Sequence, residues 1–137
     1  MDRKKVNAFM RTVTNWAEAQ PDILALALAG SYARGSGREG SDIDLIMIAS
    51  NPMKYILEDC TWVNLFGIVE KFRSEDYGRV ISLRVHYDEG LEVEFGITDE
   101  SWADTPLDLG TEQVISDGVR VLFERGDVLS RFTAAEQ

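Results

Sequence analysis

The sequence predicts one α/β domain, because helical and strand patterns alternate along a chain of ordinary domain size. It has 137 residues, 45% hydrophobic and 28% charged, a composition typical of soluble globular proteins. An amphipathic segment opens the chain, two continuous apolar runs follow, and a strictly alternating pair of segments comes later. No repeat, low-complexity stretch or linker divides it, so residues 1–137 are expected to form a single domain.

The first three elements are a helix and two buried strands. Apolar residues recur at helical spacing over 3–19, Asp2 can cap this helix, and Pro21 ends it. Residues 23–29 form a continuous apolar run that stops at Gly30, and residues 42–49, which are apolar apart from two aspartates, predict a second strand. Runs of this length favour strands that are covered on both faces.

The next segment predicts two short helices and a strand. Asn51 followed by Pro52 predicts a helix over 52–59, since proline suits the first helical position. Thr61 is expected to cap a further helical turn that ends at Gly67. Residues 68–73 favour a strand.

Residues 81–87 and 91–97 predict a hairpin, because apolar and polar side chains alternate in both. Residues 88–90 fit a three-residue turn with glycine in the left-handed position. This register faces apolar residues with apolar residues and sets Arg84 opposite Glu94 and His86 opposite Glu92. A two-residue turn would mix the faces and is rejected. Residues 111–116 then predict a helix, 119–124 a last strand, and the tail from 127 a short helix.

Charge and cysteine content narrow the classes of function. The net charge is −10, with 24 acidic and 14 basic residues, so a broad nucleic-acid surface is not expected. A nucleotide is still compatible, because a metal ion can carry the positive charge. Cys60 is the only cysteine, which fits a reducing compartment. Since neither a signal-peptide core nor a membrane-spanning run is found, a cytoplasmic protein without membrane association is expected.

Two carboxylates, Asp42 and Asp44, follow a glycine-rich turn that starts at Gly30 and Ser31. Residues i and i+2 of a strand share a face, so both side chains project the same way. Their repulsion is relieved by a hard cation such as magnesium, and the turn can bring N–H groups against phosphates. This combination points to phosphoryl or nucleotidyl transfer. The plainer interpretation is a turn-capping aspartate and a solvated strand face.

The same turn also spells G-x-G-x-x-G through Gly35, Gly37 and Gly40. A dinucleotide-binding fingerprint has to open a helix. Here an apolar strand begins at Asp42 instead, so the dinucleotide interpretation is rejected.

The pattern from Gly30-Ser31 to Asp42-x-Asp44 resembles the signature of the nucleotidyltransferase superfamily, the DNA polymerase beta-like enzymes. In that family a third acidic residue lies on a later strand between apolar residues, as Glu94 does here. Residues 62–67 and 87–95 also look like stretches of the N-terminal domain of aminoglycoside 6-adenylyltransferases. The resemblance spans roughly residues 6–131. It implies the nucleotidyltransferase fold, a mixed twisted sheet with helices mainly on one face.

The resemblance also implies a reaction and its residues. AMP would move from ATP, or another nucleoside triphosphate, to an acceptor hydroxyl such as that of an aminoglycoside-like molecule, with release of pyrophosphate. Asp42, Asp44 and Glu94 would be the catalytic and magnesium-binding residues, and Gly30, Ser31 and Arg34 would contact the triphosphate. Two alternatives to Glu94 as the third acid remain. Glu92 shares its face and could take this role, or Glu94 could do no more than form a cross-strand ion pair with Arg84.

The chain is shorter than those enzymes, which carry a further helical domain that helps to bind the acceptor. A homodimer or a second protein is therefore expected to cover the cleft. The apolar residues of the first helix and the segment around Trp102 are candidates for this surface, and equally for the core. The alternative function is a non-catalytic or partner-dependent nucleotidyltransferase-like module, such as half of a toxin–antitoxin pair.

Overall fold

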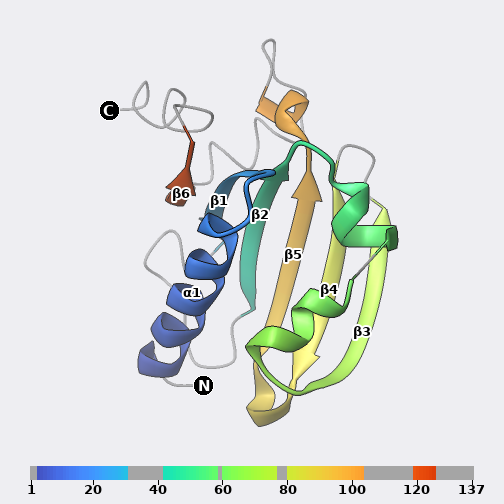
Figure 1. Ribbon diagram of the computed structural model, residues 1–137. Helices are drawn as coiled ribbons and strands as arrows, with labels where there is room; N and C mark the ends of the chain where they lie inside the picture. The colour runs from blue at the N-terminus through green and yellow to red at the C-terminus, as the bar shows by residue number, and fades with distance from the viewer. Residues whose placement is uncertain (1–2, 31–41, 59, 77–79, 104–118, 126–137) are drawn as a thin grey trace.

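A mixed six-stranded sheet with strand order β3-β4-β5-β2-β1-β6 forms the centre of the protein (Figure 1). The computed structural model describes residues 3–30, 42–58, 60–76, 80–103 and 119–125. β2 and β5 run parallel, and every other neighbouring pair is antiparallel. The sheet is thus mixed, as expected. The strands are β1 (Ile23–Ala29), β2 (Ile43–Ala49), β3 (Val69–Asp76), β4 (Ile81–Tyr87), β5 (Glu92–Thr98) and β6 (Arg120–Glu124).

The helices cover one face of this sheet. In Figure 1, α1 (Arg3–Glu18) and the short helices η1 (Lys54–Glu58) and η2 (Thr61–Phe66) all lie in front of the strands. The apolar side of α1 is buried against the sheet, so of the two roles that the sequence left open for it, intersubunit surface or core, the structure shows the core. No helix in the described ranges is long and apolar enough to cross a bilayer. The buried residues of α1 are Val6, Phe9, Met10, Val13 and Ala17.

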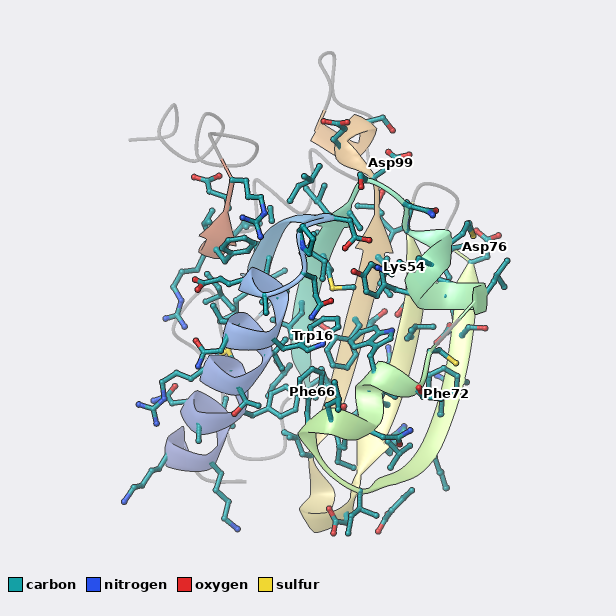
Figure 2. The ribbon with its side chains drawn as sticks, viewed as in Figure 1. Trp16, Lys54, Phe66, Phe72, Asp76 and Asp99 are labelled. Carbon is teal, nitrogen blue, oxygen red and sulfur yellow. The ribbon has the colours of Figure 1, made fainter. Side chains whose placement is uncertain are left out.

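Aromatic rings join the helices to the sheet. The Trp16 ring of α1 stacks on the Trp62 ring of η2, with centroids 4.9 Å apart and planes 8° apart. Trp62 also meets Phe95 of β5 edge-on at 4.9 Å, and its indole N–H donates to the Tyr55 carbonyl oxygen over 2.9 Å. Trp16 and Phe66 lie between α1 and η2 in Figure 2, with centroids 5.6 Å apart. Edge-on and stacked contacts of this kind add to the burial of the rings themselves.

The β4–β5 hairpin has the predicted register. Arg84 pairs with Glu94 and His86 with Glu92, and the Tyr87 N–H donates to the Leu91 carbonyl over 2.8 Å. Gly90 has a φ of 83°, the left-handed conformation expected of it. The alternation of apolar residues therefore predicted this pairing correctly.

Several boundaries differ from the sequence predictions. The helix expected over 52–59 is the single π-helical turn η1. Cys60, and not Thr61, precedes η2, and no side chain caps it. β3 extends to Asp76 because it pairs with the whole of β4, from Val69 opposite Tyr87 to Asp76 opposite Ile81.

A short 3-10 helix, η4 (Glu100–Ala103), was not expected. Its start is held by Asp99, whose carboxylate accepts a bond from the Ser101 backbone N–H over 3.0 Å. This is the usual behaviour of an aspartate that begins a turn. The predicted helix over 111–116 and the predicted tail lie outside the described residues, while the last predicted strand is β6.

Candidate active site

Four carboxylates share the face of the sheet that α1 does not cover. Successive residues of a strand point to opposite faces, and Ile43 and Leu45 of β2 are buried in the core beneath α1 and η2. Asp42 and Asp44 therefore project the other way. The same alternation in β5 turns Glu92 and Glu94 to this second face, as Val93 and Phe95 fill the core.

The parallel pairing of β2 with β5 brings these four groups into two facing pairs. Asp44 lies directly opposite Glu94 in the register, and the negative charge of Glu94 acts on the Asp44 carboxyl group. Asp42, just before β2, is close enough to Glu92 to feel its negative charge, and Arg84 Nη1 donates to both carboxylates. The structure therefore places Asp42, Asp44 and Glu94 on one face of the sheet, with Glu92 beside them.

Burial and like charge perturb these carboxyl groups. Burial, followed by the negative charges of Glu94 and Asp42, raises the pKa of Asp44 to about 6. Burial and the facing Glu92 also raise the pKa of Asp42. Burial opposes the shift of Glu92, yet the hydrogen bond from Arg84 brings its pKa below the usual value. The site thus holds more negative charge than it neutralises, which is the condition under which a divalent cation binds well.

Arg84, on the neighbouring strand β4, contacts three of the four carboxylates. Its Nη1 lies 3.2 Å from Asp42 Oδ2 and 2.9 Å from Glu92 Oε1, and its Nη2 lies 3.1 Å from Glu94 Oε2. The Nε atom is 3.5 Å from Glu75 Oε1 of β3. The cross-strand pair of Arg84 with Glu94 was predicted, but its contacts with Asp42 and Glu92 were not.

Ser82 is a second residue that the sequence analysis missed. Its side chain is buried, and its hydroxyl donates to Glu94 Oε1 over 2.7 Å. Together Ser82 and Arg84 hold both oxygens of Glu94. The signal was present in the sequence, because Ser82 stands two residues before Arg84 and so shares its face. The Oε1 atom of Glu92 contacts Arg84 Nη1 at 2.9 Å and His86 Nε2 at 3.3 Å.

Gly30 follows β1 and lies against Asp44, since Ala29 pairs with Asp44 across the two strands. Its φ is 70°, in the left-handed region. A Cβ atom here would lie 3.3 Å from Asp44 Cγ and would overlap Asp44 Oδ2. Glycine is therefore needed to leave room for a metal-binding candidate, in addition to any contact with phosphate. Ser31 and Arg34, the other predicted phosphate contacts, lie outside the described residues.

The donor set fits a hard divalent cation in its chemistry. Carboxylate oxygens are the ligands that magnesium prefers, and the raised pKa of Asp44 reports their crowding. As the side chains stand, however, no three acidic, histidine or cysteine residues within the described ranges are arranged to hold one ion. The guanidinium of Arg84 lies among the carboxylate oxygens that would have to converge on such an ion.

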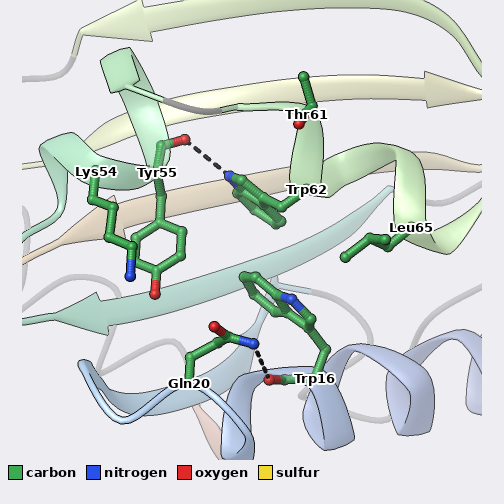
Figure 3. Close-up of a pocket in the computed structure, with 7 residues that line it drawn as sticks. All are labelled: Trp16, Gln20, Lys54, Tyr55, Thr61, Trp62 and Leu65. Carbon is green, nitrogen blue, oxygen red and sulfur yellow. Dashed lines mark hydrogen bonds between the residues drawn. The ribbon is translucent and has the colours of Figure 1, made fainter.

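A separate hollow of about 320 Å³ opens on the helix-covered side (Figure 3). It lies on the opposite face of the sheet from the carboxylates, since Trp62 contacts Phe95 and not Glu94. Its wall is aromatic, and the Gln20 amide that lines it donates to the Trp16 carbonyl over 3.3 Å. The lining residues are Trp16, Gln20, Lys54, Tyr55, Thr61, Trp62 and Leu65.

Comparisons with known proteins agree on the fold. A family model described as the nucleotidyltransferase domain matches residues 10–117. An aminoglycoside 6-adenyltransferase from Bacillus subtilis is similar in structure, with a TM-score of 0.58 and 12% identity over 87% of this chain and 40% of that one. Curated protein sequences gave no match.

RNA-modifying enzymes are similar as well. The polymerase core of TRAMP, an RNA surveillance complex, has a TM-score of 0.52 and 16% identity over 70% of this chain and 32% of its own. A cytoplasmic RNA terminal U-transferase has a TM-score of 0.50 and 17% identity over 69% and 28% of the two chains. The chain therefore spans less than half the length of each of these structures.

We expect Gly30→Ala to destabilise the fold through two separable effects. A left-handed φ costs an alanine about 1–2 kcal/mol, and the overlap with Asp44 adds to this. In an Asp44→Ala background the second effect should vanish, giving a coupling of about 1 kcal/mol or more in a double-mutant cycle of urea unfolding. Strictly additive effects would show that the space for Asp44 is not what requires glycine.

The stability of Asp44→Asn should depend on pH in a defined direction. Because the pKa of Asp44 is raised on folding to about 6, the native state binds its proton more tightly than the unfolded chain. The resulting stabilisation is present below the unfolded pKa near 4 and is lost as pH rises through about 6.

In EDTA at pH 8, the free energy of unfolding of Asp44→Asn, measured with urea, should therefore exceed that of the wild type by about 1–2 kcal/mol. This gain in stability should disappear near pH 4. Glu70→Gln, at an exposed position of the edge strand β3, is the matched control and should change little at either pH. A gain of equal size at both pH values would contradict the crowding of these carboxyl groups.

Proposed function

Since the chain belongs to the nucleotidyltransferase domain family, we propose that it transfers a nucleoside monophosphate to an acceptor hydroxyl and releases pyrophosphate. The simplest donor is ATP, which would deliver AMP. The observation that carries this proposal is the pairing of Asp44 with Glu94 across parallel strands, directly beside Gly30. Acidic side chains gathered next to the turn after β1 suit a triphosphate whose charge is balanced by metal ions.

Asp42, Asp44 and Glu94 are the residues that would hold magnesium, which would neutralise the triphosphate and lower the pKa of the acceptor hydroxyl. Gly30, Ser31 and Arg34 are proposed to contact the β and γ phosphates. Holding the triphosphate and acceptor in line supplies most of the rate gain in reactions of this type.

Glu94 is the proposed general base. The acceptor oxygen forms a bond to the α-phosphorus as the bond from that phosphorus to the bridging oxygen breaks, and pyrophosphate leaves with the electron pair. The hydroxyl proton passes to the Glu94 carboxylate. Ser82 and Arg84 each occupy one oxygen of Glu94, which fixes the carboxylate while leaving further lone pairs free to accept the proton.

A small hydroxyl-bearing molecule is the acceptor that the charge favours. Similar structures act on an aminoglycoside in one case and on RNA in others. A net charge of −10 opposes an extended polyanion, so an aminoglycoside-like cation fits better than RNA. We also propose that a second copy or another protein contributes to the acceptor site. The cytoplasm is the proposed location.

The direct test is to incubate the protein with α-labelled ATP, magnesium and a panel of aminoglycosides, lincosamides, short RNA and candidate proteins. Label transfer to a small hydroxyl compound is expected, with one pyrophosphate released for each transfer. Label on RNA alone would change the acceptor class. Absence of transfer together with tight binding of another protein would favour the partner-dependent module.

Magnesium and ATP together should stabilise the wild type by about 2.7 kcal/mol when the nucleotide is at a hundred times its Kd. The double substitution Asp42→Asn and Asp44→Asn should lose this gain while keeping the fold, because it removes ligands and relieves repulsion. Thermal unfolding with and without magnesium–ATP measures both effects. Equal shifts in the two proteins would refute the metal site.

Glu94→Gln and Glu92→Gln form a matched pair, since each removes one carboxylate that Arg84 contacts. Glu94→Gln should lower turnover by about 10²–10⁴-fold with a small change in ATP affinity, as for a group that acts in the transition state. Glu92→Gln should lower it far less. Single-turnover assays with labelled ATP measure both, and the reverse order would make Glu92 the third acid.

A further inference from the structure

We propose that Arg84 is a positioning residue that competes with the divalent metal ion for Asp42 and Glu94. This inference rests on the proposed function, because it concerns how the same carboxylates are loaded. The guanidinium holds the acidic side chains in place before a metal ion arrives. It then has to release Asp42 for the ion to bind, so Arg84 sets the metal affinity of the site.

The contacts of Arg84 place a positive charge where a shared cation would sit. Asp42 and Glu94, two of the three proposed ligands, each direct one oxygen at the guanidinium, at 3.2 and 3.1 Å. A metal ion bound through those oxygens would lie within a few ångströms of this charge. The repulsion between them is strong at such a distance. This position of Arg84 also accounts for the finding that no three acidic side chains of the described ranges surround one point.

Arg84 is held so firmly that it cannot simply leave. It stands in the middle of β4, a strand with neighbours on both sides, and its side chain is only 19% exposed. Glu92 Oε1 at 2.9 Å and Glu75 Oε1 at 3.5 Å hold the guanidinium from directions other than Asp42. When Asp42 turns to a metal ion, Arg84 therefore remains nearby as a fixed positive charge.

The contact with Asp42 is the one that gives way most readily. Asp42 is the most exposed of the three partners, at 37% of its side chain against 28% for Glu92 and 24% for Glu94. It also precedes β2, so strand pairing restrains it less. Glu94 is held by Ser82 as well as by Arg84. Asp42 is thus the movable ligand of the proposed site, and Glu94 is the fixed one.

The test is a titration of the nucleotide-free protein with Mn²⁺, followed by the electron paramagnetic resonance signal of the free ion. Arg84→Met removes the competing charge and should lower the Kd for Mn²⁺ about tenfold. Arg73→Met is the matched control. Arg73 lies opposite Arg84 on β3 and pairs with Glu75 at 3.2 Å. The substitution Arg73→Met therefore removes the same charge from a residue outside the cluster of four carboxylates, and it should change the Kd less than twofold.

Arg84→Lys keeps the experiment decisive if Arg84→Met fails to fold. A lysine retains the charge but cannot hold several carboxylates in a fork, so Asp42 is released and the Kd should fall about threefold. An unchanged or higher Kd in the folded Arg84 variants, or an equal fall in Arg73→Met, would overturn the proposal.

The two proposals fail in different ways. Tighter Mn²⁺ binding by Arg84→Met, lost again when Asp42→Asn is added, supports the competition even if no nucleotide is ever transferred by the wild type. Transfer of AMP by the wild type with no change of Mn²⁺ affinity in the Arg84 variants supports the proposed function and overturns the role of Arg84.

Discussion

The parallel pairing of β2 with β5 is the constraint on which the site depends. It is the one parallel neighbour pair among the described strands, and it sets Asp44 directly beside Glu94 although 50 positions separate them in the sequence. A shift of one residue would turn Glu94 toward Trp62 and bury its charge among aromatic rings. Packing of Val93 and Phe95 against the helices opposes that shift. The apolar core therefore fixes the register, and the register brings the acidic side chains together.

Crowded carboxylates raise the free energy of the native state, and the surrounding residues limit this effect without abolishing it. Arg84 contributes one positive charge shared among Asp42, Glu92 and Glu94. Asp44 has Glu94 as its close neighbour, and its pKa is raised to about 6. Active sites commonly hold like charges in this way, because a cation or substrate later neutralises them. The remaining excess of negative charge is the physical reason for proposing a metal site here.

Local patterns predicted the local structure well, and contacts between distant segments less well. The 3.6-residue spacing predicted α1, and alternation predicted the hairpin with Arg84 opposite Glu94. The same alternation correctly set Glu92 opposite His86 and on the face of Glu94. It could not predict that Asp42 would approach Glu92 from the neighbouring strand, where Arg84 contacts both. The wider contacts of Arg84 were missed for the same reason. They depend on which strand lies beside β5, and no spacing in the sequence encodes that choice.

Alternation along the strands separates stability from chemistry within single elements. In β5, Val93 and Phe95 pack beneath the helices while Glu92 and Glu94 face the site. In β4, Leu83 and Val85 are buried in the core while Ser82 and Arg84 hold Glu94. Because neighbouring residues serve different faces, a substitution at 94 changes charge without opening a cavity, and one at 95 does the opposite. Gly30 is the exception, because a side chain at this position would strain the backbone and would also overlap Asp44. There the fold and the site constrain the same atoms, so the sequence has least freedom at this position.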